Sequence, residues 1–142
     1  MILVTFLICV IKFNKEIQYN NSMKEINYSD LWSLFRINTR EDIKSFEVRD
    51  EYEDDHQQCA EVTINGIDCE FMWYDSVGFI HYWEESNKAF NELQSGIVAY
   101  VQQQVEALHE DGKCTDEEFA ELNLECDLFF DALREEYAAA RK

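Results

Sequence analysis

Apolar and polar residues alternate most regularly between positions 59 and 73, on both sides of Asn65-Gly66. Both central positions of a type I′ turn need a positive φ angle, which Asn and Gly adopt at low cost. This dipeptide therefore predicts a β-hairpin with a two-residue turn. In that register Ile64 faces Ile67 and Val62 faces Cys69, so one face of the hairpin is apolar.

The other face of the predicted hairpin carries an unusual pair of like charges. Glu61 falls directly opposite Glu70, and Asp68 lies beside Thr63. Like charges in opposed positions destabilise a strand pair. We therefore take Glu61, Asp68 and Glu70 as candidate contact residues for a cationic partner.

The pattern predicts further strands on each side of the hairpin. In the run 46–52, Phe46, Val48, Asp50 and Tyr52 alternate with charged residues, which indicates a half-buried strand. We expect Glu53-Asp54-Asp55 to form a solvated loop after it. Following the hairpin, a turn at 75–78 leads to a further strand that places Phe79, His81 and Trp83 on the acidic face.

Three segments have helical periodicity. Ser29 or Asp30 can cap a short helix over 30–37. Ser86 is the expected cap of a long helix that ends at Gly112, and its apolar stripe is Phe90, Leu93, Ile97, Tyr100 or Val101, Val105 and Leu108. Gly96 within it predicts close approach by another element.

The last helix begins with the capping box Thr115 to Glu118. Its expected buried stripe is Phe119, Leu122, Cys126, Phe129 or Phe130, Leu133 and Tyr137. Glu117, Glu121 and Glu125 line the opposite edge.

These elements predict an α+β fold, in which an antiparallel β-meander of three or more strands packs against two long C-terminal helices, with a short N-terminal helix. We expect residues 23–142 to form a single acidic domain. The apolar segment 1–22 is interpreted as an edge strand or an upstream extension. Its apolar run is shorter than the roughly 20 residues that cross a membrane, and it lacks the basic start of a signal peptide.

The amino-acid composition indicates the class of partner. With 12 basic and 30 acidic residues the chain has a formal charge of −18, yet 46% of its residues are hydrophobic, which is typical of a folded domain rather than a disordered one. Acids are concentrated in 47–55 and 110–136. This charge repels nucleic acid and anionic membranes and attracts basic proteins.

The cysteines and histidines predict neither a metal site nor a catalytic one. Cys9, Cys59, Cys69, Cys114 and Cys126 are widely spaced, which indicates buried free thiols in the cytoplasm. His56, Cys59 and Cys69 can supply three zinc ligands, but no second close pair completes the set. We expect no cofactor and no enzymatic activity, because no nucleophile elbow or phosphate loop is present.

The primary functional hypothesis is a non-catalytic inhibitor whose carboxylates imitate nucleic acid phosphates on the basic surface of a partner. In size and charge the chain resembles phage-encoded anti-restriction and anti-CRISPR proteins, which would act in the host cytoplasm. The alternatives are an immunity or antitoxin-type protein that neutralises a basic nuclease, and a cytosolic interaction adaptor. The candidate contact residues are Asp50, Glu51, Glu53, Asp54, Asp55, Glu61, Asp68, Glu70, Trp83, Glu117, Glu121 and Glu125.

Overall fold

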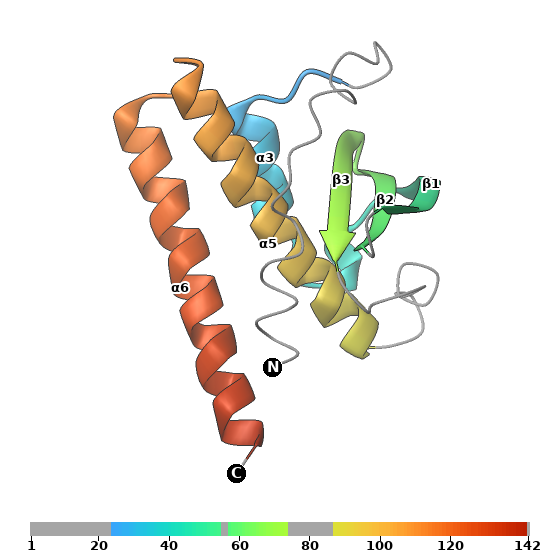
Figure 1. The fold of residues 1–142 in the computed structure, drawn as a ribbon. Helices are drawn as coiled ribbons and strands as arrows, with labels where there is room; N and C mark the ends of the chain where they lie inside the picture. The colour runs from blue at the N-terminus through green and yellow to red at the C-terminus, as the bar shows by residue number, and fades with distance from the viewer. Residues whose placement is uncertain (1–23, 55–56, 74–86, 142) are drawn as a thin grey trace.

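The three-stranded sheet is built around the hairpin at Asn65-Gly66. The computed structural model describes residues 24–54, 57–73 and 87–141 (Figure 1). Strands β1 (Phe46–Asp54), β2 (Gln57–Ile64) and β3 (Ile67–Trp73) lie antiparallel in the order β1-β2-β3. Asn65 and Gly66 have φ angles of 51° and 80°. The predicted register is confirmed, including Glu61 opposite Glu70.

The uninterrupted alternation predicted for β1 is wrong, because the pairing shifts by one residue between Val48 and Asp50. Val48 pairs with Val62, but Asp50 pairs with Glu61, so Arg49 is the extra residue of a β-bulge. Asp50 and Tyr52 consequently leave the apolar face of Phe46 and Val48. They join the face of Glu61 and Glu70.

The loop expected at Glu53-Asp54-Asp55 begins later than predicted. Glu53 and Asp54 belong to β1, where they pair with Gln58 and Gln57. Asp55 lies outside the described residues, as do the turn and strand expected between 75 and 83, including Trp83. The cap expected at Ser86 and the segment 1–22 are outside them as well.

The short helix α3 (Tyr28–Phe35) begins earlier than predicted. Its cap is Asn27, whose side chain accepts a hydrogen bond from the Asp30 amide at 2.9 Å, rather than Ser29 or Asp30. Leu31 and Leu34 are buried. A short 3-10 helix, η1 (Arg40–Asp42), follows and leads into β1.

Helix α5 (Asn87–Glu110) supplies the centre of the core. Its predicted stripe is buried up to Val105, and Leu108 packs at its border. Gly96 faces the Phe71 ring of β3, but the two elements approach no more closely there than an ordinary side-chain contact. A Cβ at position 96 would lie 3.9 Å from Phe71 Cγ, an ordinary van der Waals distance.

Helix α6 (Asp116–Ala140) begins at the predicted capping box, with the Thr115 side chain bonded to the Glu118 amide. Leu122, Cys126 and Phe130 are buried as predicted. The other four members of the expected stripe are only half-buried: Phe119, Phe129, Leu133 and Tyr137.

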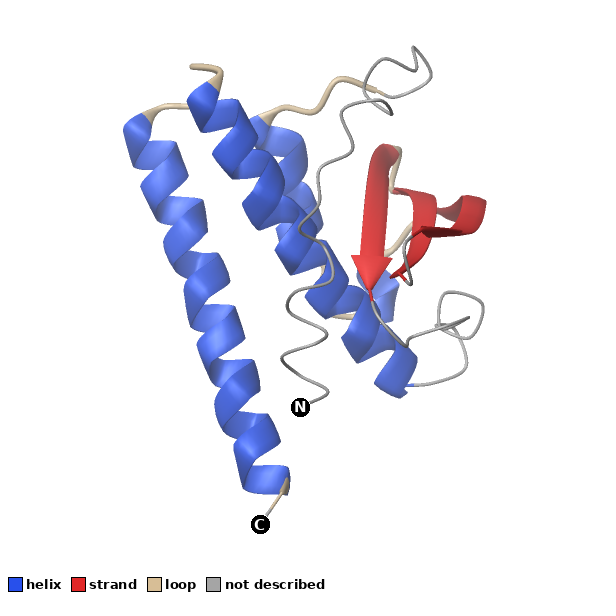
Figure 2. Ribbon diagram, viewed as in Figure 1, coloured by secondary structure: helices blue, strands red, loops and turns tan. Residues whose placement is uncertain are grey.

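The elements form three layers, namely the sheet, α5 with α3, and α6 (Figure 2). Helix α5 packs against both β3 and α6, so α6 lies on the side of α5 away from the sheet. The predicted α+β class, with an antiparallel meander, two long C-terminal helices and a short N-terminal helix, is confirmed.

Candidate acidic interface

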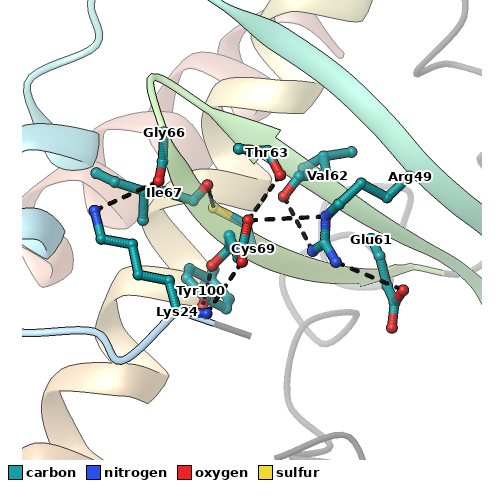
Figure 3. Close-up of polar contacts among 10 residues, drawn as sticks. Lys24, Arg49, Glu61, Val62, Thr63, Gly66, Ile67, Cys69 and Tyr100 are labelled. Atoms are coloured by element: carbon teal, nitrogen blue, oxygen red, sulfur yellow. Dashed lines mark hydrogen bonds and ion pairs between the residues drawn. The ribbon is translucent and has the colours of Figure 1, made fainter. Parts of the chain in front are cut away.

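Arg49 follows Val48 in β1 and therefore lies on the same face of the sheet as the acids of the hairpin, next to Glu61 (Figure 3). The Arg49 guanidinium lies 3.9 Å from Glu61 and 3.8 Å from Asp68, and its Nη2 donates to the Val62 carbonyl at 3.5 Å. A cation among like charges removes most of their mutual repulsion. Arg49 therefore compensates the like charges that the sequence pattern left unexplained.

Asp68 is satisfied by several donors. The Thr63 hydroxyl donates to Asp68 Oδ1 at 2.7 Å, and the Lys24 amide donates to Oδ2 at 3.1 Å. Burial raises the pKa of Asp68, but these hydrogen bonds and the Arg49 charge outweigh burial, so the pKa is lowered overall. Asp68 is therefore ionised and held in place.

Glu70 has a different environment. The Tyr52 hydroxyl donates to Glu70 Oε1 at 2.7 Å, because the bulge turns Tyr52 to this face. Burial raises the pKa of Glu70, and the nearby charge of Glu61 adds to the effect, although Tyr52 and Arg49 oppose it. Burial and the same hydrogen bond raise the pKa of Tyr52.

These sheet-face acids are mostly buried as well as paired. The side chains of Glu61 and Asp68 retain only 21% and 14% of their exposure. A partner would have to displace internal contacts to reach them. The Glu61–Glu70 pair, which predicted a partner contact, is thus accounted for by contacts within the chain.

The acids of β1 are exposed, and β1 is an outer strand of the sheet that the described residues form. Asp50, Glu51 and Glu53 all have solvent-accessible side chains. The structure describes Asp54 as part of the strand but not its side chain. Charged residues on an edge strand prevent pairing with other chains, so this location explains their charge without a partner.

Helix α6 carries the densest exposed acidic surface of the described residues. Its 25 residues include nine acids and one basic residue, Arg134, which pairs with Asp131. At 1.5 Å per residue the helix is about 37 Å long, so it carries about one carboxylate per 4 Å. Glu117, Glu121 and Glu125 are all exposed.

The structure does not bring the candidate residues together into one surface. Helix α6 and strand β1 lie on opposite sides of the molecule, with α5 between them (Figure 1). Glu61, Asp68 and Glu70 form the sheet-face cluster, and Asp50 of β1 pairs directly with Glu61 at its border. The described candidate residues therefore form two separate acidic surfaces, one on the sheet and one on α6.

Sequence reasoning missed two exposed apolar side chains on α6. Leu124 and Leu128 have 59% and 55% of their surface exposed. Both fall outside the stripe assigned to the core, and a helical projection of that stripe would have placed them on the opposite side.

The thiols do not form a metal site or an activated nucleophile in the described parts of the chain. Cys59 and Cys69 are buried and directed to opposite faces of the sheet, because Cys69 pairs with Val62 and Cys59 with Met72. His56 lies outside the described residues. Burial raises the pKa of Cys114, and that of Cys126 to about 12, the reverse of an activated thiol.

Over residues 24–54, 57–73 and 87–141 the structure contains no cluster of three or more metal-ligating side chains. In the same residues, no helix combines the length and the hydrophobicity needed to cross a membrane. Comparison of the chain with protein-family models, with curated proteins and with solved structures finds no match.

Proposed function

We propose that this protein is a non-catalytic inhibitor that occupies the basic nucleic-acid-binding surface of a partner protein through the exposed carboxylates of α6. The observation that carries the proposal is the charge density of this helix, about one carboxylate per 4 Å of axis. A single DNA strand carries one phosphate per about 3.4 Å, so the two spacings are similar.

Helix α6 supports this function better than the other acidic surfaces do. The sheet-face acids are compensated by Arg49 and mostly buried, and the β1 acids have a role in protecting the sheet edge. On α6, the pairing of Arg134 with Asp131 leaves most of the carboxylates without a cation on the helix. A cationic partner would relieve that repulsion.

The size of the net charge also supports a functional role. A formal charge of −18 exceeds the magnitude of about 2 to 8 that keeps a small domain soluble. Self-repulsion of this size opposes compaction. A phage-encoded inhibitor that acts against a host defence nuclease, of the anti-restriction or anti-CRISPR kind, is the specific form of the proposal.

Displacement of DNA tests the proposal. Labelled duplex DNA is bound to each of a panel of purified basic nucleases and restriction or CRISPR effector complexes, and the protein is added at about 50 mM and about 500 mM salt. We expect release of DNA from at least one complex at low salt and little release at high salt, because exposed charges are screened over about 3 Å at 1 M.

Poly-glutamate at equal charge concentration is the matched control. The folded protein should displace DNA at a much lower concentration than poly-glutamate does, because its carboxylates are held in a fixed array. Equal potency would show that the fold contributes nothing. Failure to release DNA from any complex at low salt would contradict the proposal.

A second candidate, neutralisation of a basic nuclease toxin by an immunity-type contact, is favoured by the exposed Leu124 and Leu128. Compact hot spots combine an apolar centre with charged surroundings. In that case the protein would still bind the nuclease at high salt. It would not displace DNA, because its contact site would lie away from the nucleic acid channel.

A further inference from the structure

Leu124 and Leu128 lie on the side of α6 that faces away from α5. Helix α6 buries Leu122, Cys126 and Phe130 on the side that faces α5. At 3.6 residues per turn the two leucines fall on the opposite side of the helix. Among the described residues, Leu124 and Leu128 are the two large apolar side chains that are exposed to solvent.

The leucines occupy the centre of a regular row on the outer side of α6. The row consists of Glu117, Glu121, Leu124, Leu128, Asp131 and Glu135, all of them exposed. Its intervals alternate between four and three residues. This spacing keeps side chains on one seam and is the spacing at which two helices interlock.

Charge determines which occupant fits the row. The row reads acid, acid, leucine, leucine, acid, acid in either direction. A second copy of the chain would therefore place acids against acids at both ends, whether the helices ran parallel or antiparallel. The Asp131–Arg134 pair is a surface ion pair, which a partner cation can exchange at little cost.

We propose that the outer row of α6 binds an amphipathic basic helix of the partner. Leu124 and Leu128 form the apolar centre of the contact, and the acids at both ends pair with Lys or Arg one and two turns away on the partner helix. This inference rests on the proposed function, which supplies the positive charge of the partner. It adds that affinity depends on two apolar anchors and that charge alone is insufficient.

A synthetic helical peptide provides the probe. It carries two leucines four residues apart, and lysines three and seven residues outside each leucine, to match the row. The control peptide keeps every lysine and replaces both leucines with glutamine. Binding to the full chain is measured by fluorescence anisotropy at low salt. We expect the leucine peptide to bind at least about tenfold more tightly, because partial burial of its two leucines together contributes more than a factor of ten.

The variant Leu124→Gln/Leu128→Gln tests the anchors directly. Glutamine has nearly the helix propensity of leucine, and both positions are exposed, so the fold should be retained. We expect this variant to lose the preference for the leucine peptide. The control variant Ala140→Gln, at an exposed position of the same helix on another side from the row, should keep it.

Each contrary outcome identifies which claim fails. If the leucine variant binds both peptides as the wild type does, Leu124 and Leu128 are not anchors of the contact. If that binding is still sensitive to salt, the proposed function is not contradicted. If neither peptide binds at low salt, the attraction for basic surfaces fails too. A dimer in light scattering that Leu124→Gln/Leu128→Gln dissociates would overturn the charge argument against a second copy.

Discussion

Arg49 changes the electrostatic environment of the acidic residues around it. The sequence places Glu61 opposite Glu70, a repulsive pair if nothing intervenes. Arg49 lies on the same face, 3.9 Å from Glu61 and 3.8 Å from Asp68. The three carboxylates then become parts of an internal network, and their stability depends on this one cation.

Arg49→Gln should destabilise the fold by about 1–3 kcal/mol, because it leaves mostly buried carboxylates without their cation. Urea unfolding at pH 7 provides the measurement. In the background of Glu61→Gln the same substitution should cost less by about 0.5–1 kcal/mol, since one of the acids is already neutral. An Arg49→Gln variant as stable as the wild type would show that the network contributes no stability.

Glu70 should make stability depend on pH in a defined direction. Its pKa is higher in the folded state than in the unfolded state, mainly because of burial. Its contribution is therefore fully present below the unfolded pKa of about 4.5 and is lost as pH rises through the raised folded pKa. Urea unfolding of Glu70→Gln and wild type between pH 4.5 and 7 should show the variant gaining relative stability as pH rises. An unchanged or opposite difference would contradict the assignment.

Asn65 connects the hairpin turn to the segment of chain that precedes β1. Besides forming the turn, its side chain accepts from the Lys44 and Ser45 amides at 2.6 and 3.1 Å and donates to the Asp42 carbonyl at 3.0 Å. The hairpin turn thereby positions the chain that enters β1. These three hydrogen bonds, which we call the Asn65 bracket, join residues about 20 positions apart. No local sequence pattern predicts them.

Asn65→Gly keeps the freedom to adopt positive φ but removes the three side-chain hydrogen bonds. We expect a loss of about 1–2 kcal/mol in urea unfolding, since these exposed groups can partly bond to water instead. The Gly66→Ala variant is a useful comparison, because it strains a φ of 80° and leaves the bracket intact. No loss in Asn65→Gly would show that the bracket is dispensable.

Gly96 tests the packing of α5 on the sheet. The Phe71 ring lies at an ordinary contact distance from a Cβ at this position, so alanine fits without displacing it. Gly96→Ala should therefore stabilise the protein by about 0.5–1 kcal/mol through helix propensity and reduced unfolded-state entropy. Thermal unfolding would reveal the gain, and a lower melting temperature would show that α5 and β3 pack more tightly than described.

The elements could be predicted from the sequence where one local rule determines them. Asn65-Gly66 determines the turn, Thr115 to Glu118 the start of α6, and the 3.6-residue stripe the buried face of α5. The bulge at Arg49 could not be predicted, because the contact that it makes possible, between Tyr52 and Glu70, joins residues 18 positions apart. The start of α3 was misplaced because Asn27, Ser29 and Asp30 are all good caps.

The fold distributes the acidic residues over different parts of the molecule, which the net charge alone does not reveal. The described acids considered as contact residues lie on the sheet, where Arg49 compensates one face and β1 carries the exposed members, and on α6. Only the distribution in space distinguishes these groups, so the choice among candidate contact residues required the structure. The partner contact proposed here is confined to α6.

The most direct test compares two variants with equal charge on opposite sides of the molecule. Glu117→Gln/Glu121→Gln/Glu125→Gln neutralises α6, and Asp50→Asn/Glu51→Gln/Glu53→Gln neutralises β1. Their DNA-displacement activity at low salt is compared with that of the wild type, after circular dichroism confirms the fold. We expect the α6 variant to lose at least about tenfold in potency and the β1 variant to stay within about threefold. An α6 variant that displaces DNA as well as the wild type would contradict the account.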